Sequence, residues 1–169
     1  MNQRDLFYKW LFYSAAALLF LLIQGLILNR LSLWGGVHPF LVPLLALMPS
    51  TLENRDESVL FAVIFGFFTD LLMPGPAPGF YTLVFLAIAI LSGIIAGRLL
   101  MPGFLCACVC SAVGLIVCGL IYLLTALSHP AISLLDALGL IGREVVLTLP
   151  FSPAIFWLDR KIYLRMRDL

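Results

Sequence analysis

The chain has 169 residues, of which 63% are hydrophobic and only 11% charged, with a mean hydropathy of +1.11. Soluble domains have about 45–50% apolar and about 25% charged residues, so this composition excludes a water-soluble globular protein. The 13 Phe, 5 Tyr and 3 Trp exclude a disordered chain, and 10 Lys and Arg against 9 Asp and Glu lack the basic excess that nucleic-acid binding needs. At about 20 residues per crossing, the length holds roughly six spanning helices. We therefore predict an all-α polytopic membrane protein, a single domain over residues 1–169.

The first two predicted spans cover residues 10–28 and 37–52. The first is apolar apart from Ser14 and Gln24, and no small-residue cleavage site follows it, so we expect an uncleaved helix. The second is short and contains three prolines: Pro39, Pro43 and Pro49. Because prolines remove backbone hydrogen bonds, we expect this span to be bent and packed inside the bundle. The charged segment Glu53–Glu57 after it is expected to be a surface loop.

Three further spans are predicted at residues 58–72, 80–98 and 103–127. The segment 73–79 between the first two has three prolines and two glycines in seven residues, which excludes both helix and strand. The span 103–127 holds all four cysteines: Cys106, Cys108, Cys110 and Cys118. Without a CxxC pair or a nearby histidine, we interpret them as packing residues and expect no metal site, disulfide or cofactor.

The end of the chain is ambiguous. Residues 132–141 fit either an interfacial helix or the start of a long one, and Arg143 and Glu144 interrupt the apolar pattern. We predict the sixth span at 141–158, with Pro150 and Pro153 inside it, and a basic cytoplasmic tail at 159–169. The positive-inside rule favours six crossings with both termini cytoplasmic. That arrangement leaves Arg30 outside and Arg143 at the membrane, and places eight basic residues inside: Arg4, Lys9, Arg55, Arg98, Arg160, Lys161, Arg165 and Arg167.

Asp70 is the one acid inside a span outside the ambiguous last region. An acid at membrane depth costs roughly 2.5–3.5 kcal/mol on insertion scales, so it should face the bundle interior, be protonated or be paired. One interpretation is a proton, ion or ligand site, reached along the small residues Ala62 and Gly66. The interpretation we favour is a helix-end acid that binds the backbone of the following loop or pairs with Arg30 or Arg143.

The other polar candidates favour structural roles. Arg143 and Glu144 could join an outward-facing polar cluster with Asp70, Arg30 and Asp136. Adjacent residues on a helix diverge by about 100°, however, so the two cannot face one partner together. We favour the interpretation that they mark the membrane interface where the last span begins. Two lone histidines beside prolines, His38 and His129, are interpreted as turn residues rather than metal ligands.

Small residues recur every four positions in the fourth span, at Ala89, Gly93 and Gly97. Such stripes let helices approach closely in lipid, so we expect tight packing, within the chain by default. The sequence contains no Gly-x-Ser-x-Gly, HExxH or P-loop motif and no Arg ladder. We therefore expect no enzymatic activity.

The stretch Gly66-Phe67-Phe68-Thr69-Asp70, the Pro/Gly loop ending at Gly79, and a span closing with Gly93, Gly97 and Arg98 resemble the rod shape-determining protein MreD family. Size, six-span layout and the short basic tail after a proline-broken last helix match over almost the whole chain. The resemblance implies a non-enzymatic scaffold of the bacterial cell-elongation machinery in the inner membrane. The implied partners are MreC, the filament protein MreB, and the peptidoglycan synthase RodA with its transpeptidase. A homo-oligomer is possible on the sequence alone.

The same family has a fold similar to the substrate-binding subunits of energy-coupling-factor vitamin transporters. That similarity implies an alternative, a six-helix subunit that takes a small metabolite from the outer side. A third hypothesis is a small membrane enzyme or proton-coupled carrier that depends on Asp70. The candidate interaction and structural residues are Gly66, Asp70, Gly79, Ala89, Gly93, Gly97 and Arg98.

Overall fold

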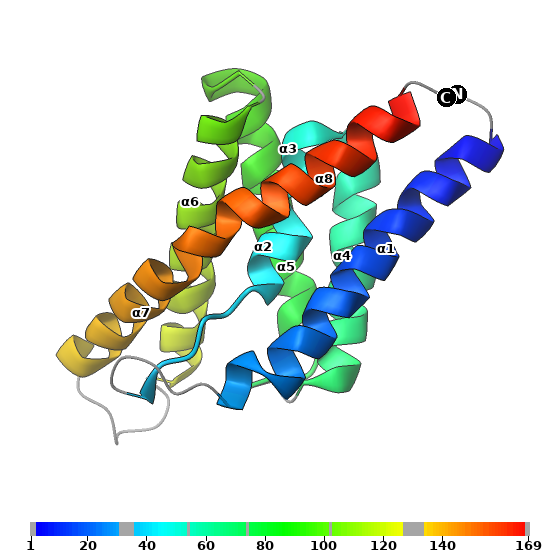
Figure 1. Cartoon of the computed structure of the whole chain (residues 1–169). Helices are drawn as coiled ribbons and strands as arrows, with labels where there is room; N and C mark the ends of the chain where they lie inside the picture. Colours follow the sequence, from blue (N-terminus) through cyan, green and yellow to red (C-terminus); the bar gives the residue numbers. More distant parts are fainter. Residues whose placement is uncertain are drawn as a thin grey trace.

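The computed structural model describes residues 3–30, 36–53, 55–73, 75–101, 103–126 and 134–167, and every regular element in these ranges is helical (Figure 1). The elements in chain order are α1 Gln3–Leu26, η1 Leu28–Arg30, α2 Val42–Leu47, α3 Pro49–Leu52, α4 Arg55–Leu72, α5 Phe80–Ile94, the π-helical turn η3 Ile95–Leu99, α6 Phe104–Ala126, α7 Leu134–Thr148, η4 Leu149–Phe151 and α8 Ser152–Arg167.

Three stretches are long and apolar enough to cross a membrane: Phe7–Arg30, Phe80–Leu99 and Phe104–Leu124. Large apolar side chains on α1 are exposed, among them Leu18, Leu19 and Leu22. Water would disfavour so much exposed apolar surface, whereas lipid would not. These helices identify an integral membrane protein.

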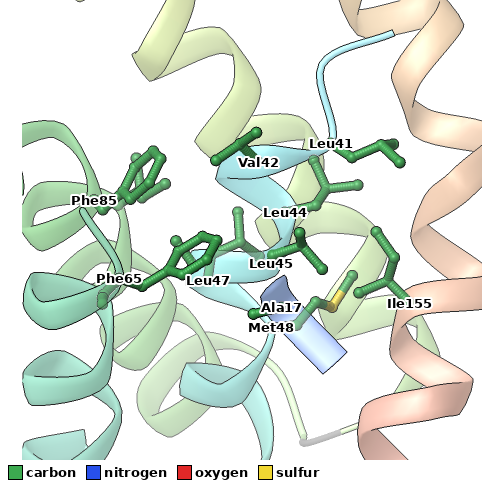
Figure 2. Packing of buried hydrophobic residues seen from close by; sticks show 14 of the residues in the cluster. Ala17, Leu41, Val42, Leu44, Leu45, Leu47, Met48, Phe65, Phe85 and Ile155 are labelled. Carbon is green, nitrogen blue, oxygen red and sulfur yellow. The ribbon is translucent and has the colours of Figure 1, made fainter. Parts of the chain in front are cut away.

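The short helices α2 and α3 lie at the centre of the bundle. Every residue from Leu41 to Thr51 is buried. Figure 2 shows Leu44, Leu47 and Met48 among side chains from the surrounding helices, including Phe65 of α4, Phe85 of α5 and Ile155 of α8. Pro43 and Pro49 each occupy the first turn of a helix, where the missing N–H needs no partner. The structure thus agrees with the expectation of a bent, interior segment.

Helices α4 and α5 form a closely packed antiparallel pair. A Cβ atom added at Gly66 would lie 2.7 Å from the Cα of Thr82 and 2.9 Å from the carbonyl oxygen of Tyr81. Aromatic rings continue this contact, with Phe65 stacked on Phe85 at a centroid distance of 5.9 Å. Gly79 begins α5 as its N-cap with φ +74°, a left-handed conformation that glycine adopts without strain.

Gly66→Ala should destabilise the protein, because its methyl group would push the α5 backbone away from α4. Overpacking of this kind costs about 1–3 kcal/mol. The control is Gly97→Ala, since a Cβ there meets nothing within 4 Å. Unfolding by a denaturing detergent, followed by circular dichroism, should show a loss for Gly66→Ala and little change for Gly97→Ala. Equal stability of the two variants would contradict the close approach.

Helices α7 and α8 extend along one line in Figure 1, interrupted by the 3₁₀ turn η4 that contains Pro150. Of the two alternatives for residues 132–141, the described part, from Leu134 onward, is the start of a long helix. Residues 159–167, predicted as a tail, belong to α8, which packs against α1 and α6. The Asp159 side chain is buried, whereas Arg160, Lys161, Leu164 and Arg165 are exposed, so the start of the predicted tail packs into the bundle as a continuation of α8.

The start of α1 and the end of α8 lie at one end of the bundle, which we call the terminal end (Figure 1). The Glu53–Glu57 region is also at the terminal end, because Lys9 of α1 contacts both glutamates. The opposite end, which we call the far end, holds the end of α1, the end of α4 and the start of α7 (Figure 1).

Candidate functional site

The Asp70 carboxylate caps the N-terminus of α5. It accepts hydrogen bonds from the backbone N–H groups of Tyr81 at 2.9 Å and Thr82 at 3.0 Å, and from the Thr82 hydroxyl at 2.6 Å. The first N–H groups of a helix have no partner inside it, and the helix dipole favours a negative charge there. Gly66 brings α4 close enough for this contact, so Gly66, Asp70 and Gly79 meet at one place, which we call the α4–α5 corner.

This geometry supports the structural interpretation of Asp70. Its described contacts are the α5 backbone and Thr82 rather than Arg30 or Arg143. Both oxygens of the carboxylate accept hydrogen bonds from the start of α5, which is the arrangement of a helix cap. Sequence reasoning identified the residue and the class of interaction, but not the helix that it caps.

The small-residue stripe is only partly used inside the chain. Ala89 is fully buried, Gly93 is partly buried, and Gly97 is exposed, with nothing within 4 Å of its position. Arg98 is exposed in the π-helical turn that ends α5. The stripe therefore packs within the bundle at Ala89 and is open at Gly97.

A buried polar network lies at the terminal end. Lys9 Nζ is 2.9 Å from Glu53 Oε2 and 3.2 Å from Glu57 Oε2, and the Lys9 and Glu53 side chains are each only 6% exposed. Trp10 Nε1 donates to Glu57, and the Tyr13 hydroxyl donates to Glu53. The segment predicted as a surface loop thus contributes Glu53 to the interior and the one-third exposed Glu57 at its edge, and its residues from Arg55 onward belong to α4. Sequence reasoning missed this network because its members are 40 to 48 positions apart.

Asp159 is buried close to this network, and the Tyr13 hydroxyl contacts its backbone carbonyl at 3.4 Å. It follows directly after the last predicted span. Burial disfavours the charged form and raises the pKa of the Asp159 carboxyl to about 8.

Because the unfolded pKa of an aspartate is about 3.9, the folded state holds a proton on Asp159 that the unfolded state releases between about pH 4 and pH 8. Stability should therefore fall as pH rises through this window. Asp159→Asn cannot ionise, so its melting temperature in detergent should depend less on pH than that of the wild type. The Asp56→Asn variant, at an exposed acid, is the control. A wild-type stability that rises over the same window would contradict the buried neutral carboxyl.

A cavity of about 390 Å³ opens at the far end of the bundle. Its walls come from the end of α1, the segment 36–40, the start of α5, the second half of α6, and α7. Ligand sites in proteins typically measure about 300–1,000 Å³, so the volume fits a small molecule. Sequence reasoning did not predict the cavity.

Hydrogen bonds between elements hold the cavity walls in place. The Gln24 side chain on α1 donates to the Pro39 carbonyl at 2.8 Å and to Asn29 at 2.7 Å, and it accepts from the Leu41 N–H at 3.0 Å. The Phe40 N–H donates to the Thr148 hydroxyl of α7 at 3.0 Å. Gln24, one of the two polar residues of the first span, therefore fixes the segment that leads into α2.

Glu144 and His38 both line the cavity, while Arg143 is exposed and is not among the lining residues. The divergence of Arg143 and Glu144 agrees with their adjacent positions on a helix. His38 already has an interaction within the molecule. His129 lies outside the described residues, so only His38 of the two predicted turn histidines is placed.

The four cysteines are free thiols, and Cys106 and Cys110 are 3.9 Å apart between sulfur atoms. Within the described residues, no group of three or more His, Cys, Asp or Glu side chains has the arrangement of a metal site. No family model matches the chain, and neither a curated protein nor a solved structure matches it.

Proposed function

We propose that this protein is a non-enzymatic inner-membrane scaffold of the bacterial cell-elongation machinery. In this role it binds MreC and connects MreB filaments with RodA and its transpeptidase partner. The resemblance to the MreD family rests on a glycine, an aspartate four residues later, a proline–glycine turn and a following helix. One observation carries the proposal: Gly66, Asp70 and Gly79 of that pattern meet at the α4–α5 corner.

That corner gives the pattern a physical reason. Glycine allows the two helices to touch, the aspartate four residues later caps the second helix, and the left-handed glycine starts it. In the proposed arrangement the helices cross six times with both termini cytoplasmic, which puts the terminal end inside and the far end outside.

The open end of the small-residue stripe supplies a partner surface in this proposal. Gly97 and Arg98 are exposed in η3, the π-helical turn that follows α5, and the adjacent Leu99 is 73% exposed. A small residue on such a face lets a helix of another protein approach closely. We propose that a partner helix, in the first instance that of MreC, packs here.

A cell-shape assay tests this role. Depletion of the protein should turn rods into spheres, and the wild-type chain should restore rods. Gly97→Leu should restore shape poorly although the protein accumulates normally. Gly25→Leu is the matched control, since Gly25 is also a helical glycine with nothing within 4 Å. Rods that persist after depletion would refute the scaffold role.

The cavity favours a second candidate, the small-metabolite-binding subunit of an energy-coupling-factor type transporter. Its volume and its place at the far end fit a site open to the outer side. Uptake measurements separate the two roles: a transporter subunit is needed for accumulation of its metabolite, whereas a scaffold is needed for cell shape.

A further inference from the structure

The cavity at the far end has an aromatic wall. Phe40 and Tyr81 are 6.3 Å apart between ring centroids, Tyr81 and Phe80 are 5.3 Å apart, and Phe80 and Tyr122 are 6.4 Å apart. These four rings come from the segment before α2, from α5 and from α6, and all of them line the cavity. The faces of aromatic rings are negative, so such a wall attracts cations as well as apolar groups.

The charged side chain in the lining of the cavity also favours a cation. Glu144 is the only acid among the described residues that line it, and that lining includes neither lysine nor arginine. The ion pairs of Lys9 with Glu53 and Glu57 lie at the terminal end rather than at this cavity. Glu144 lines the same cavity as Tyr81 and Cys118. A cationic group bound beside this carboxylate would offset the cost of its partial burial.

The structure around the aromatic wall is fixed before any ligand binds. Asp70 holds the backbone of Tyr81 and Thr82, Gln24 holds the segment before α2, and the Phe40 N–H is bound to Thr148 on α7. A Cβ added at Gly119 would lie 2.7 Å from Cγ2 of Ile141, so α6 and α7 are also in close contact where they line the cavity. A preformed site loses little conformational entropy on binding.

We propose that this cavity binds a small organic cation, with its ammonium group at Glu144 and its aromatic or aliphatic body against the ring wall. An anion would meet an uncompensated carboxylate, and a neutral molecule would leave that carboxylate without a charge partner. The inference goes beyond the scaffold role and does not depend on any protein partner.

The test uses the full-length protein purified in lipid nanodiscs and three probes of similar shape: phenethylamine, phenethyl alcohol and hydrocinnamate. At neutral pH these are a cation, a neutral molecule and an anion. Calorimetry and thermal unfolding should show saturable binding of phenethylamine, and at least roughly tenfold weaker binding of the other two, as expected for one charge-assisted contact. Because wild-type protein alone is used, this comparison does not depend on how a variant folds.

Glu144→Gln keeps the side-chain shape and removes the charge, so it should weaken phenethylamine binding roughly tenfold or more and leave phenethyl alcohol binding unchanged. Asp56→Asn, at an exposed acid on α4, is the control and should bind like the wild type. The proposal is overturned if no probe binds at millimolar concentration, if the three probes bind equally, or if Glu144→Gln binds phenethylamine like the wild type. Equal binding would identify an apolar cavity filled without regard to charge. Because no partner protein is present, none of these outcomes bears on the scaffold role.

Discussion

The Asp70→Ala variant should lose about 2–4 kcal/mol of unfolding free energy, because it leaves the first N–H groups of α5 without their acceptor. The wild-type carboxylate accepts from Tyr81 N–H, Thr82 N–H and the Thr82 hydroxyl. Asp70→Asn keeps one acceptor oxygen, so its unfolding free energy should lie between those of the wild type and Asp70→Ala. Unfolding in a denaturing detergent, followed by circular dichroism, should show that stability decreases from the wild type to Asp70→Asn and then to Asp70→Ala.

Asp56→Ala is the control for this series, since Asp56 is an exposed acid in the first turn of α4 and should cost well under 1 kcal/mol. The alternative role for Asp70, in a membrane enzyme or proton-coupled carrier, predicts a different pattern. In that case Asp70→Asn would remain as stable as the wild type while losing all activity. Such a result would refute the cap as the main reason for the aspartate.

The Lys9→Met variant should lose about 3–5 kcal/mol, because it leaves two carboxylates near one another without their cation. Both the Lys9 and the Glu53 side chains are only 6% exposed, so water cannot replace the lost partner. In the same unfolding measurement, this variant should be less stable than any variant in which a single exposed charge is replaced. Lys161→Met is the matched control, since Lys161 is exposed and its Nζ lies over the Trp157 ring, 5.2 Å from the ring centroid.

A compensating variant makes the Lys9 prediction sharper. Lys9→Met combined with Glu53→Gln and Glu57→Gln removes the uncompensated charges and should recover part of the lost stability. Failure to recover any stability would mean that Lys9 acts through the packing of its aliphatic chain rather than through the ion pairs.

Local composition predicted the helical character of the chain and the interior position of the second span. The second span contains Pro39, Pro43 and Pro49. Each proline removes a backbone N–H donor at its own position, so its effect can be predicted from the sequence alone. Asp70 was likewise identified by its position in an apolar helix. We favoured a hydrogen bond to the backbone of the following loop or a pair with Arg30 or Arg143, and the carboxylate does bind backbone, but that backbone is the first turn of α5. The aspartate could be assigned a type of partner but not the particular helix.

Features that depend on distant pairing could not be predicted. The Lys9 network joins α1 to residues more than 40 positions later, and the cavity is bounded by segments from Gln24 to Glu144. Residues 159–167 contain enough basic side chains to suggest a tail, yet Asp159 is buried in α8. A single sequence does not show which helices meet, so these arrangements needed the structure.

The scaffold role is tested most directly by purification of the protein from native membranes in mild detergent after brief crosslinking. We predict that MreC is recovered with the wild-type chain and with Gly25→Leu, and that much less is recovered with Gly97→Leu. If the wild-type protein, at its normal cellular level, brought down neither MreC nor any other component of the elongation machinery, the proposal would be contradicted.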